Sequence, residues 1–106
     1  MKELDKDSFD QAVLGHPGVI LVDFWSETCE TCQAMMPAME ALESELGQKV
    51  TFAKVNIQGN RRLAIREKVL GLPTVVIYKN GERRASFSKE FTTDQLKTAV
   101  AEALGG

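Results

Sequence analysis

The sequence lacks three features that would place it in common functional classes. It contains no apolar run approaching the ~20 consecutive residues that cross a bilayer. It has no excess of positive charge, because the formal net charge is -2 at pH 7, whereas nucleic acid binding requires a concentrated basic surface. Its N-terminal residues, Met1 to Asp10, are charged and lack the apolar stretch of a secretory signal. We therefore expect a cytoplasmic protein that binds neither membranes nor nucleic acid.

Metal-binding residue types are equally scarce. The chain has two cysteines, Cys29 and Cys32, and one histidine, His16, in a turn-like segment. A zinc site requires four protein ligands, or three and a water, so one chain supplies too few. Zinc shared between two chains stays as an alternative. A purely structural disulfide would close a very short loop and gain the least chain entropy. In a reducing cytosol, paired thiols are more often catalytic or metal-binding.

The remaining composition is that of an ordinary globular domain. The chain is 106 residues long, 43% hydrophobic and 26% charged, which suits a single core. We expect one domain over residues 1–106, without internal repeats or linkers. Apolar runs and apolar residues at helical spacing indicate the elements. Strands are expected at 2–4, 19–25, 50–57, 74–79 and 82–88, and helices at 8–14, from the cysteine turn to 46, at 60–68 and from 92 onward.

Two local signals support this reading of the chain. Asn80-Gly81 predicts a hairpin between the last two strands. Thr92 with Gln95 predicts a capping box at the start of the last helix. Alternating strands and helices followed by a hairpin predict an α/β domain, in which a central mixed β-sheet is flanked by helices on both faces.

The cysteines lie where the first long strand gives way to a helix. Free N–H groups and the helix dipole favour an anion there, so Cys29 is expected to be the reactive thiolate. Cys32 falls on the same side of the first turn and can reach the sulfur of Cys29. One thiol can then attack a target disulfide, and the other can resolve the mixed disulfide. Asp23, inside an apolar strand, is expected to be buried, which would raise its pKa and ready it for proton exchange.

These motifs resemble those of the thioredoxin family over essentially the whole chain. The active-site segment of thioredoxins is similar to Val22-Asp23-Phe24-Trp25 followed by Cys-x-x-Cys and Pro37 in this chain. Their cis-proline loop is similar to Gly71-Leu72-Pro73-Thr74, and their hairpin to Tyr78-Lys79-Asn80-Gly81. The resemblance implies a thioredoxin fold and a thiol–disulfide oxidoreductase that reduces protein disulfides.

The resemblance also implies roles for individual residues. Cys29 would attack, Cys32 would resolve, and Asp23 would be the buried acid, with Lys54 its neighbour on the adjacent strand. A cis Leu72–Pro73 peptide would pack against the cysteines and pair with a substrate backbone. The substrate-binding residues would be Trp25, Glu30, Thr31, Leu72, Pro73 and Thr74.

The resemblance further implies the partners. No bound cofactor and no metal are implied, so electrons must come from a separate thioredoxin reductase; we expect a monomer. The segment from Arg61 to Pro73 resembles thioredoxins of glycine, sarcosine and betaine reductase systems, so a dedicated electron donor to such a system is an alternative. An alternative of another class is a non-redox protein-binding subunit on the same fold.

The sequence departs from the family at the active site. The usual dipeptide between the cysteines is Gly-Pro, and here it is Glu30-Thr31. Thr28, Gln33 and Lys89 stand where a tryptophan, a lysine and a glycine are common. We expect a redox potential different from that of a typical thioredoxin, in a direction that the sequence does not give. Alternatively, Glu30 points into solvent and only suits the helix dipole.

Replacing this dipeptide tests the influence of Glu30. Glu30→Gly combined with Thr31→Pro should lower the pKa of Cys29, because an anion within ~4–6 Å disfavours a second anion. The ultraviolet absorbance of the thiolate, followed against pH in a Cys32→Ser background, measures this pKa. An unchanged or higher pKa would rule out the electrostatic effect.

Overall fold

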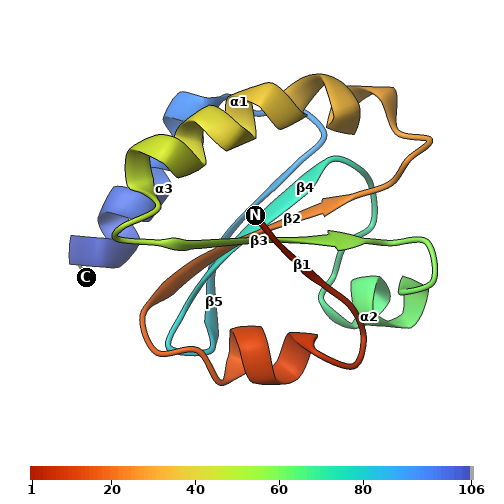
Figure 1. Cartoon of the computed structure of the whole chain (residues 1–106), viewed down its shortest axis with the longest axis horizontal. Helices are drawn as coiled ribbons and strands as arrows, with labels where there is room; N and C mark the ends of the chain where they lie inside the picture. Colours follow the sequence, from red (N-terminus) through yellow and green to blue (C-terminus); the bar gives the residue numbers. More distant parts are fainter. Residues whose placement is uncertain (106) are drawn as a thin grey trace.

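A five-stranded mixed sheet forms the centre of the molecule, which a computed structural model describes over residues 1–105 (Figure 1). The strand order is β1-β3-β2-β4-β5. β1, β3 and β2 are parallel neighbours, whereas β4 and β5 are antiparallel to the strands beside them. The strands are β1 (Lys2–Leu4), β2 (Val19–Trp25), β3 (Thr51–Asn56), β4 (Thr74–Lys79) and β5 (Glu82–Ser88). This confirms the predicted mixed sheet.

Helical segments cover both faces of the sheet, as predicted (Figure 1). One face carries the short segments η1 (Asp10–Leu14) and α2 (Arg61–Arg66). The other carries the longer α1 (Glu30–Leu46) and α3 (Thr93–Gly105). None of the helices within residues 1–105 is both long enough and apolar enough to cross a membrane.

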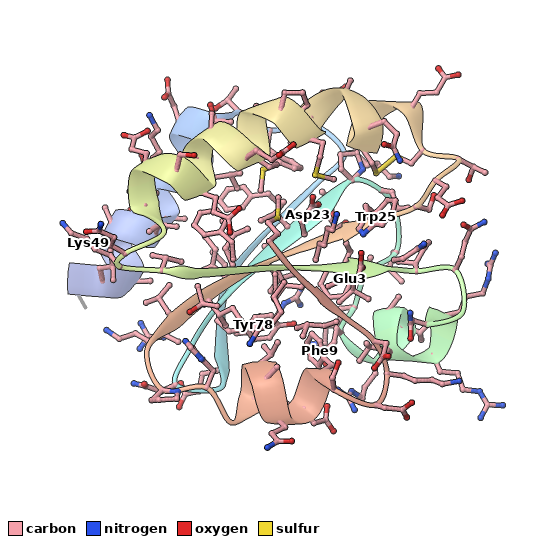
Figure 2. The ribbon with its side chains drawn as sticks, in the orientation of Figure 1. Glu3, Phe9, Asp23, Trp25, Lys49 and Tyr78 are labelled. Atoms are coloured by element: carbon pink, nitrogen blue, oxygen red, sulfur yellow. A yellow bond between two sulfur atoms is a disulfide. The ribbon has the colours of Figure 1, made fainter. Side chains whose placement is uncertain are left out.

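The alternation of side chains along β2 divides the core into two layers. Ile20, Val22 and Phe24 pack with η1 and α2, whereas Val19 and Leu21 pack with α1 and α3. All of these side chains are at most 4% exposed, as a continuous apolar run predicts for a central strand. The same period of two places Asp23 on the face covered by α1 (Figure 2).

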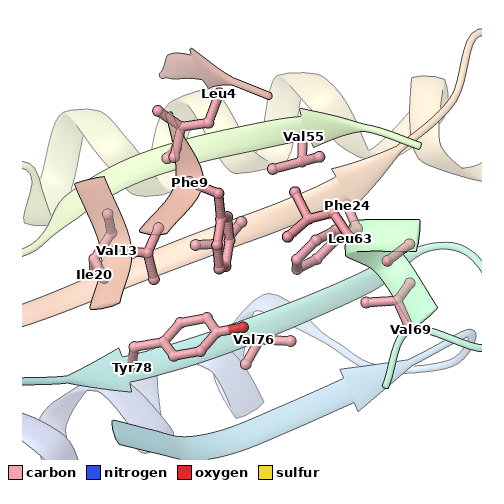
Figure 3. Close-up of a cluster of buried hydrophobic side chains, with 13 residues drawn as sticks. Leu4, Phe9, Val13, Ile20, Phe24, Val55, Leu63, Val69, Val76 and Tyr78 are labelled. Carbon is pink, nitrogen blue, oxygen red and sulfur yellow. The ribbon is translucent and has the colours of Figure 1, made fainter. Parts of the chain in front are cut away.

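An aromatic cluster joins η1 to the sheet (Figure 3). The rings of Phe9 and Tyr78 meet edge to face, with centroids 6.0 Å apart. The hydroxyl of Tyr78 donates a hydrogen bond to Glu67 Oε1 at 2.7 Å. Burial raises the pKa of Tyr78, and the hydrogen bond to Glu67 raises it further. The hydroxyl therefore stays protonated and connects the core to the residue that follows α2.

Two helices differ from the prediction. The expected helix at 8–14 is a π-helical turn, in which the Gly15 N–H donates to the carbonyl of Asp10 at 3.0 Å. The expected helix at 60–68 is shorter because Lys68 has a φ of 64°. A left-handed residue cannot continue a right-handed helix. Neither feature has a local sequence signal: Phe9 before η1 is buried against the sheet, and the chain turns at Lys68 before it enters β4.

Both turn signals are confirmed. Asn80 and Gly81 have φ angles of 52° and 83°, as a two-residue type I′ hairpin requires. At the start of α3, the Thr92 N–H donates to Gln95 Oε1 at 2.8 Å, and the Gln95 N–H donates to Thr92 Oγ1 at 3.2 Å. This reciprocal pair is the predicted capping box.

Removing the cap should weaken α3. Thr92→Ala is expected to lower the free energy of unfolding by about 1 kcal/mol, because the helix loses a side-chain acceptor for its N-terminal N–H groups. Urea denaturation measures this change. The control is Ser44→Ala, an exposed site within α1 where alanine favours the helix. An equal loss of stability in both variants would contradict the capping role.

Candidate functional site

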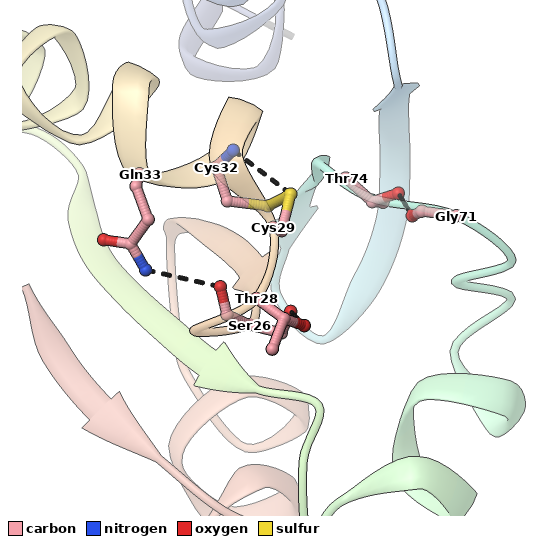
Figure 4. Close-up of a disulfide and its surroundings, with 7 residues drawn as sticks. All are labelled: Ser26, Thr28, Cys29, Cys32, Gln33, Gly71 and Thr74. Atoms are coloured by element: carbon pink, nitrogen blue, oxygen red, sulfur yellow. Dashed lines mark hydrogen bonds between the residues drawn. A yellow bond between two sulfur atoms is a disulfide. The ribbon is translucent and has the colours of Figure 1, made fainter.

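The two cysteines form a disulfide at the start of α1 (Figure 4). Cys29 is the N-cap residue, and its Sγ accepts a hydrogen bond from the Cys32 N–H at 3.1 Å. The two Cα atoms are 5.2 Å apart, which is within the usual range for a disulfide. The structure therefore confirms that the pair lies at a helix N-terminus with the sulfurs in bonding reach.

The two sulfurs differ in accessibility. Cys29 is half-buried, whereas Cys32 is 2% exposed and belongs to the buried part of α1. Another protein can thus reach Cys29 but not Cys32. Cys29 Sγ also accepts the hydrogen bond from the Cys32 N–H in the first turn, which stabilises negative charge on this sulfur when the disulfide opens.

A short polar turn positions Cys29. The carbonyl of Ser26 accepts hydrogen bonds from the Cys29 N–H at 3.2 Å and from Gln33 Nε2 at 3.3 Å. The hydroxyls of Ser26 and Thr28 lie 3.3 Å apart (Figure 4). Ser26 is 4% exposed and was not among the site residues expected from the sequence. A small polar residue between a buried strand and a cysteine turn is the signal that could have identified it.

Asp23 is buried beneath the segment that carries the cysteines. The side chain is 4% exposed, and burial raises its pKa to about 7, an effect that the positive charge of Lys54 partly opposes. Lys54 is its register partner on β3. The expected burial of this carboxyl is therefore confirmed.

Lys54 lies beside Asp23, but its ammonium group has other neighbours. Its Nζ is 3.9 Å from Glu3 Oε1 and 5.2 Å from the centre of the Trp25 ring. Within residues 1–105, the buried indole Nε1 of half-buried Trp25 has no hydrogen-bond partner. Figure 2 labels Glu3, Asp23 and Trp25 in this region. Glu3, which was not among the site residues expected from the sequence, thus contacts the ammonium group of Lys54, the expected neighbour of Asp23.

The Leu72–Pro73 peptide is cis, as the resemblance implied. Thr74 pairs with Phe24 across β4 and β2, which brings the loop to the end of the sheet where the cysteine turn begins. Thr74 Oγ1 donates to the carbonyl of Gly71 at 2.6 Å and lies 3.0 Å from Ser88 Oγ. Figure 4 shows Gly71 and Thr74 in the surroundings of the disulfide.

The residues between the cysteines are at the surface. Glu30 and Thr31 are the first residues of α1, and both are exposed. Glu30 thus has the solvent exposure that the alternative interpretation requires, and it also provides an acidic group in the first turn, which suits the helix dipole. Its effect on the pKa of Cys29 stays a prediction.

This geometry defines a class of protein. An accessible sulfur at a helix N-terminus, bonded to a buried second sulfur and supported by a buried carboxyl, is suited to dithiol–disulfide exchange. The fold and the site are therefore those of a thiol–disulfide oxidoreductase.

Comparisons with known proteins identify the family. The family model for thioredoxin matches residues 1–102. A thioredoxin of Acetoanaerobium sticklandii is 52% identical over 93 residues, covering 88% of this chain and 89% of the relative. One of Peptoclostridium acidaminophilum is 40% identical over 104 residues, covering 97% and 94%. One of Rhodospirillum rubrum is 42% identical over 86 residues, covering 81% and 83%. The chain belongs to the thioredoxin family.

The buried carboxyl should make stability depend on pH. Asp23 has a pKa of about 7 in the folded protein, against 3.8 ordinarily. Between these values the folded state keeps a proton that the unfolded state has released, so the free energy of unfolding falls as pH rises. The Asp23→Asn variant has no ionisable carboxyl at this position, so its free energy of unfolding does not fall for this reason as pH rises. The variant should exceed the wild type by about 2–4 kcal/mol near pH 8, and the gain should shrink toward zero near pH 4.

Urea denaturation of the oxidised proteins at each pH measures this gain. Glu40→Gln is the matched control, because Glu40 is an exposed carboxylate on α1 and should give no such pH-dependent gain. A gain of the same size at both pH values would show that ionisation of Asp23 is not its cause.

Proposed function

We propose that this protein reduces disulfides in other proteins, with Cys29 as the attacking and Cys32 as the resolving cysteine. The observation that carries the assignment is the difference in accessibility between the half-buried Cys29 and the 2% exposed Cys32. A target disulfide can approach only the first. The position of Cys29 at the N-cap of α1 supports the same order of attack.

The reaction proceeds in two exchanges. The Cys29 thiolate attacks one sulfur of the target, the target S–S bond breaks, and the other target sulfur leaves and takes up a proton. The Cys32 thiol then loses its proton and attacks Cys29 Sγ, which releases the first target sulfur as a thiol. The target gains two electrons and two protons, and the dithiol becomes the Cys29–Cys32 disulfide.

Asp23 handles the proton of the second exchange in this proposal. Cys32 is buried, so bulk water does not readily remove its proton. A carboxyl with a pKa of about 7 can accept and return a proton near neutral pH. Lys54, next to Asp23 on β3, opposes the rise in that pKa and so helps to set the pH at which the transfer works.

The cis-proline loop provides the binding edge for the target. Within residues 1–105, the N–H and C=O of Leu72 form no backbone hydrogen bond, and Leu72 is partly exposed. An extended target segment can pair with these groups in the manner of an added strand. Pro73 and Thr74 hold the loop, while Trp25, Glu30 and Thr31 surround the cysteines and contact the target from the other side.

Electrons reach the protein from a thioredoxin reductase in this proposal. The proposal includes a cytoplasmic location and a monomeric state, both of which are expected from the sequence. The segment from Arg61 to Pro73 favours a second candidate, in which the physiological acceptor is a glycine, sarcosine or betaine reductase system. The cysteine chemistry is the same in both, so only the partner distinguishes them.

Cysteine variants test the order of attack. Cys29→Ser should abolish the acceleration of insulin reduction by dithiothreitol. Cys32→Ser should still attack and should accumulate mixed disulfides, because the resolving thiol is missing. The bound proteins are captured from a native extract, separated under non-reducing conditions and identified by mass spectrometry.

The trapped partners also decide between the two candidates. Subunits of a glycine, sarcosine or betaine reductase among them would support the second candidate, and a range of unrelated disulfide proteins would support the first. The matched control is Cys29→Ser in the same extract, which should trap nothing. Mixed disulfides that form on Cys32 rather than on Cys29 would overturn the assignment.

A further inference from the structure

Lys89 adopts a backbone conformation that lysine rarely takes. Its φ is 68°, in the left-handed region where a Cβ atom is disfavoured. It directly follows β5, and its N–H donates to the carbonyl of Pro73 at 2.8 Å. This bond ties Lys89 to the loop proposed to bind the target. Residues held in disfavoured conformations persist where the surrounding structure requires them, often at functional sites.

The side chain of Lys89 lies over the binding loop. A methyl group added at Gly71 would lie 2.5 Å from Lys89 Cε and 3.5 Å from Nζ. The aliphatic stem therefore packs on Gly71 and leaves the charged end at the rim of the loop. The hydrogen bond from Thr74 Oγ1 to the Gly71 carbonyl, and the contact of Thr74 with Ser88, hold the loop and the end of β5 together.

The charge of Lys89 is not used inside the molecule. Lys89 is exposed, and within residues 1–105 it forms no ion pair. The cysteine turn carries two exposed acidic side chains, Glu27 and Glu30, and the exposed Glu90 follows Lys89 in the chain. Acidic groups thus lie on the cysteine turn, whereas the ammonium group of Lys89 lies over Gly71 in the cis-proline loop.

We propose that Lys89 selects target disulfides that have an acidic residue beside the attacked cysteine, in the part of the target chain that passes over Gly71. This inference rests on the proposed binding of the target along Leu72. A glycine would take a φ of 68° without strain, so the backbone alone does not account for a lysine here. A carboxylate of the target would pair with Lys89, whereas the opposite orientation would place it near Glu27 and Glu30.

Matched peptides test this inference. Two peptides with the same intramolecular disulfide differ only in flanking residues, aspartate in one and lysine in the other. The reduced wild-type protein should reduce the aspartate peptide faster, by up to about fivefold, as expected for one exposed charge pair. Lys89→Gln and Lys89→Gly should abolish this preference, and Lys89→Glu should reverse it. High salt should weaken it in the wild type.

Two controls separate the charge of Lys89 from other effects. Lys49→Gln makes the same change in net charge at an exposed lysine that lies at the opposite end of the molecule from Trp25 (Figure 2) and should keep the wild-type preference. Lys89→Gly should also raise the urea midpoint, since it relieves the left-handed strain, whereas Lys89→Gln should not.

The outcomes separate this inference from the proposed function. Equal rates for the two peptides with the wild-type protein, or a preference kept in Lys89→Gln, would overturn the role of Lys89 and leave disulfide reduction standing. Failure of the wild-type protein to reduce either peptide or insulin would overturn the proposed function, and the inference with it.

Discussion

Strand β2 pairs with β3 on one side and β4 on the other, and helices cover both of its faces. Every part of the site depends on this arrangement. The strand carries Asp23 into the interior and ends at Trp25, where the chain turns into α1 and presents Cys29 at the helix N-terminus. The cis-proline loop enters β4, the antiparallel neighbour of β2, so the register of these strands places it at the same end of the sheet.

Two opposite electrostatic effects meet at this end of the sheet. In the first turn of α1, the Cys32 N–H donates to Cys29 Sγ, and the helix dipole favours negative charge on this sulfur. Burial of Asp23 disfavours negative charge on its carboxyl and raises its pKa to about 7. In the proposed mechanism, a proton that leaves a thiol can therefore reside on this carboxyl near neutral pH.

Much of the fold could be predicted from the sequence because its signals are local. The apolar run of β2, the Asn80-Gly81 turn and the Thr92 capping box each depend on a few neighbouring residues, and the structure contains all three. The π-helical form of η1 and the early end of α2 could not be predicted. They depend on how the chain packs against the sheet and returns to β4, which residues far apart in the sequence determine.

For the site, the sequence by itself determined the cysteine pair, its place at a helix start and the burial of Asp23, because all lie within one strand–turn–helix segment. The tertiary structure decided what surrounds that segment. Only folding sets Lys54 between Asp23 and Glu3, encloses Ser26, and brings Lys89 onto Gly71 beside the cis peptide. These contacts join residues from separate strands and loops, and side chains distant in sequence become neighbours only when the sheet brings their backbones together.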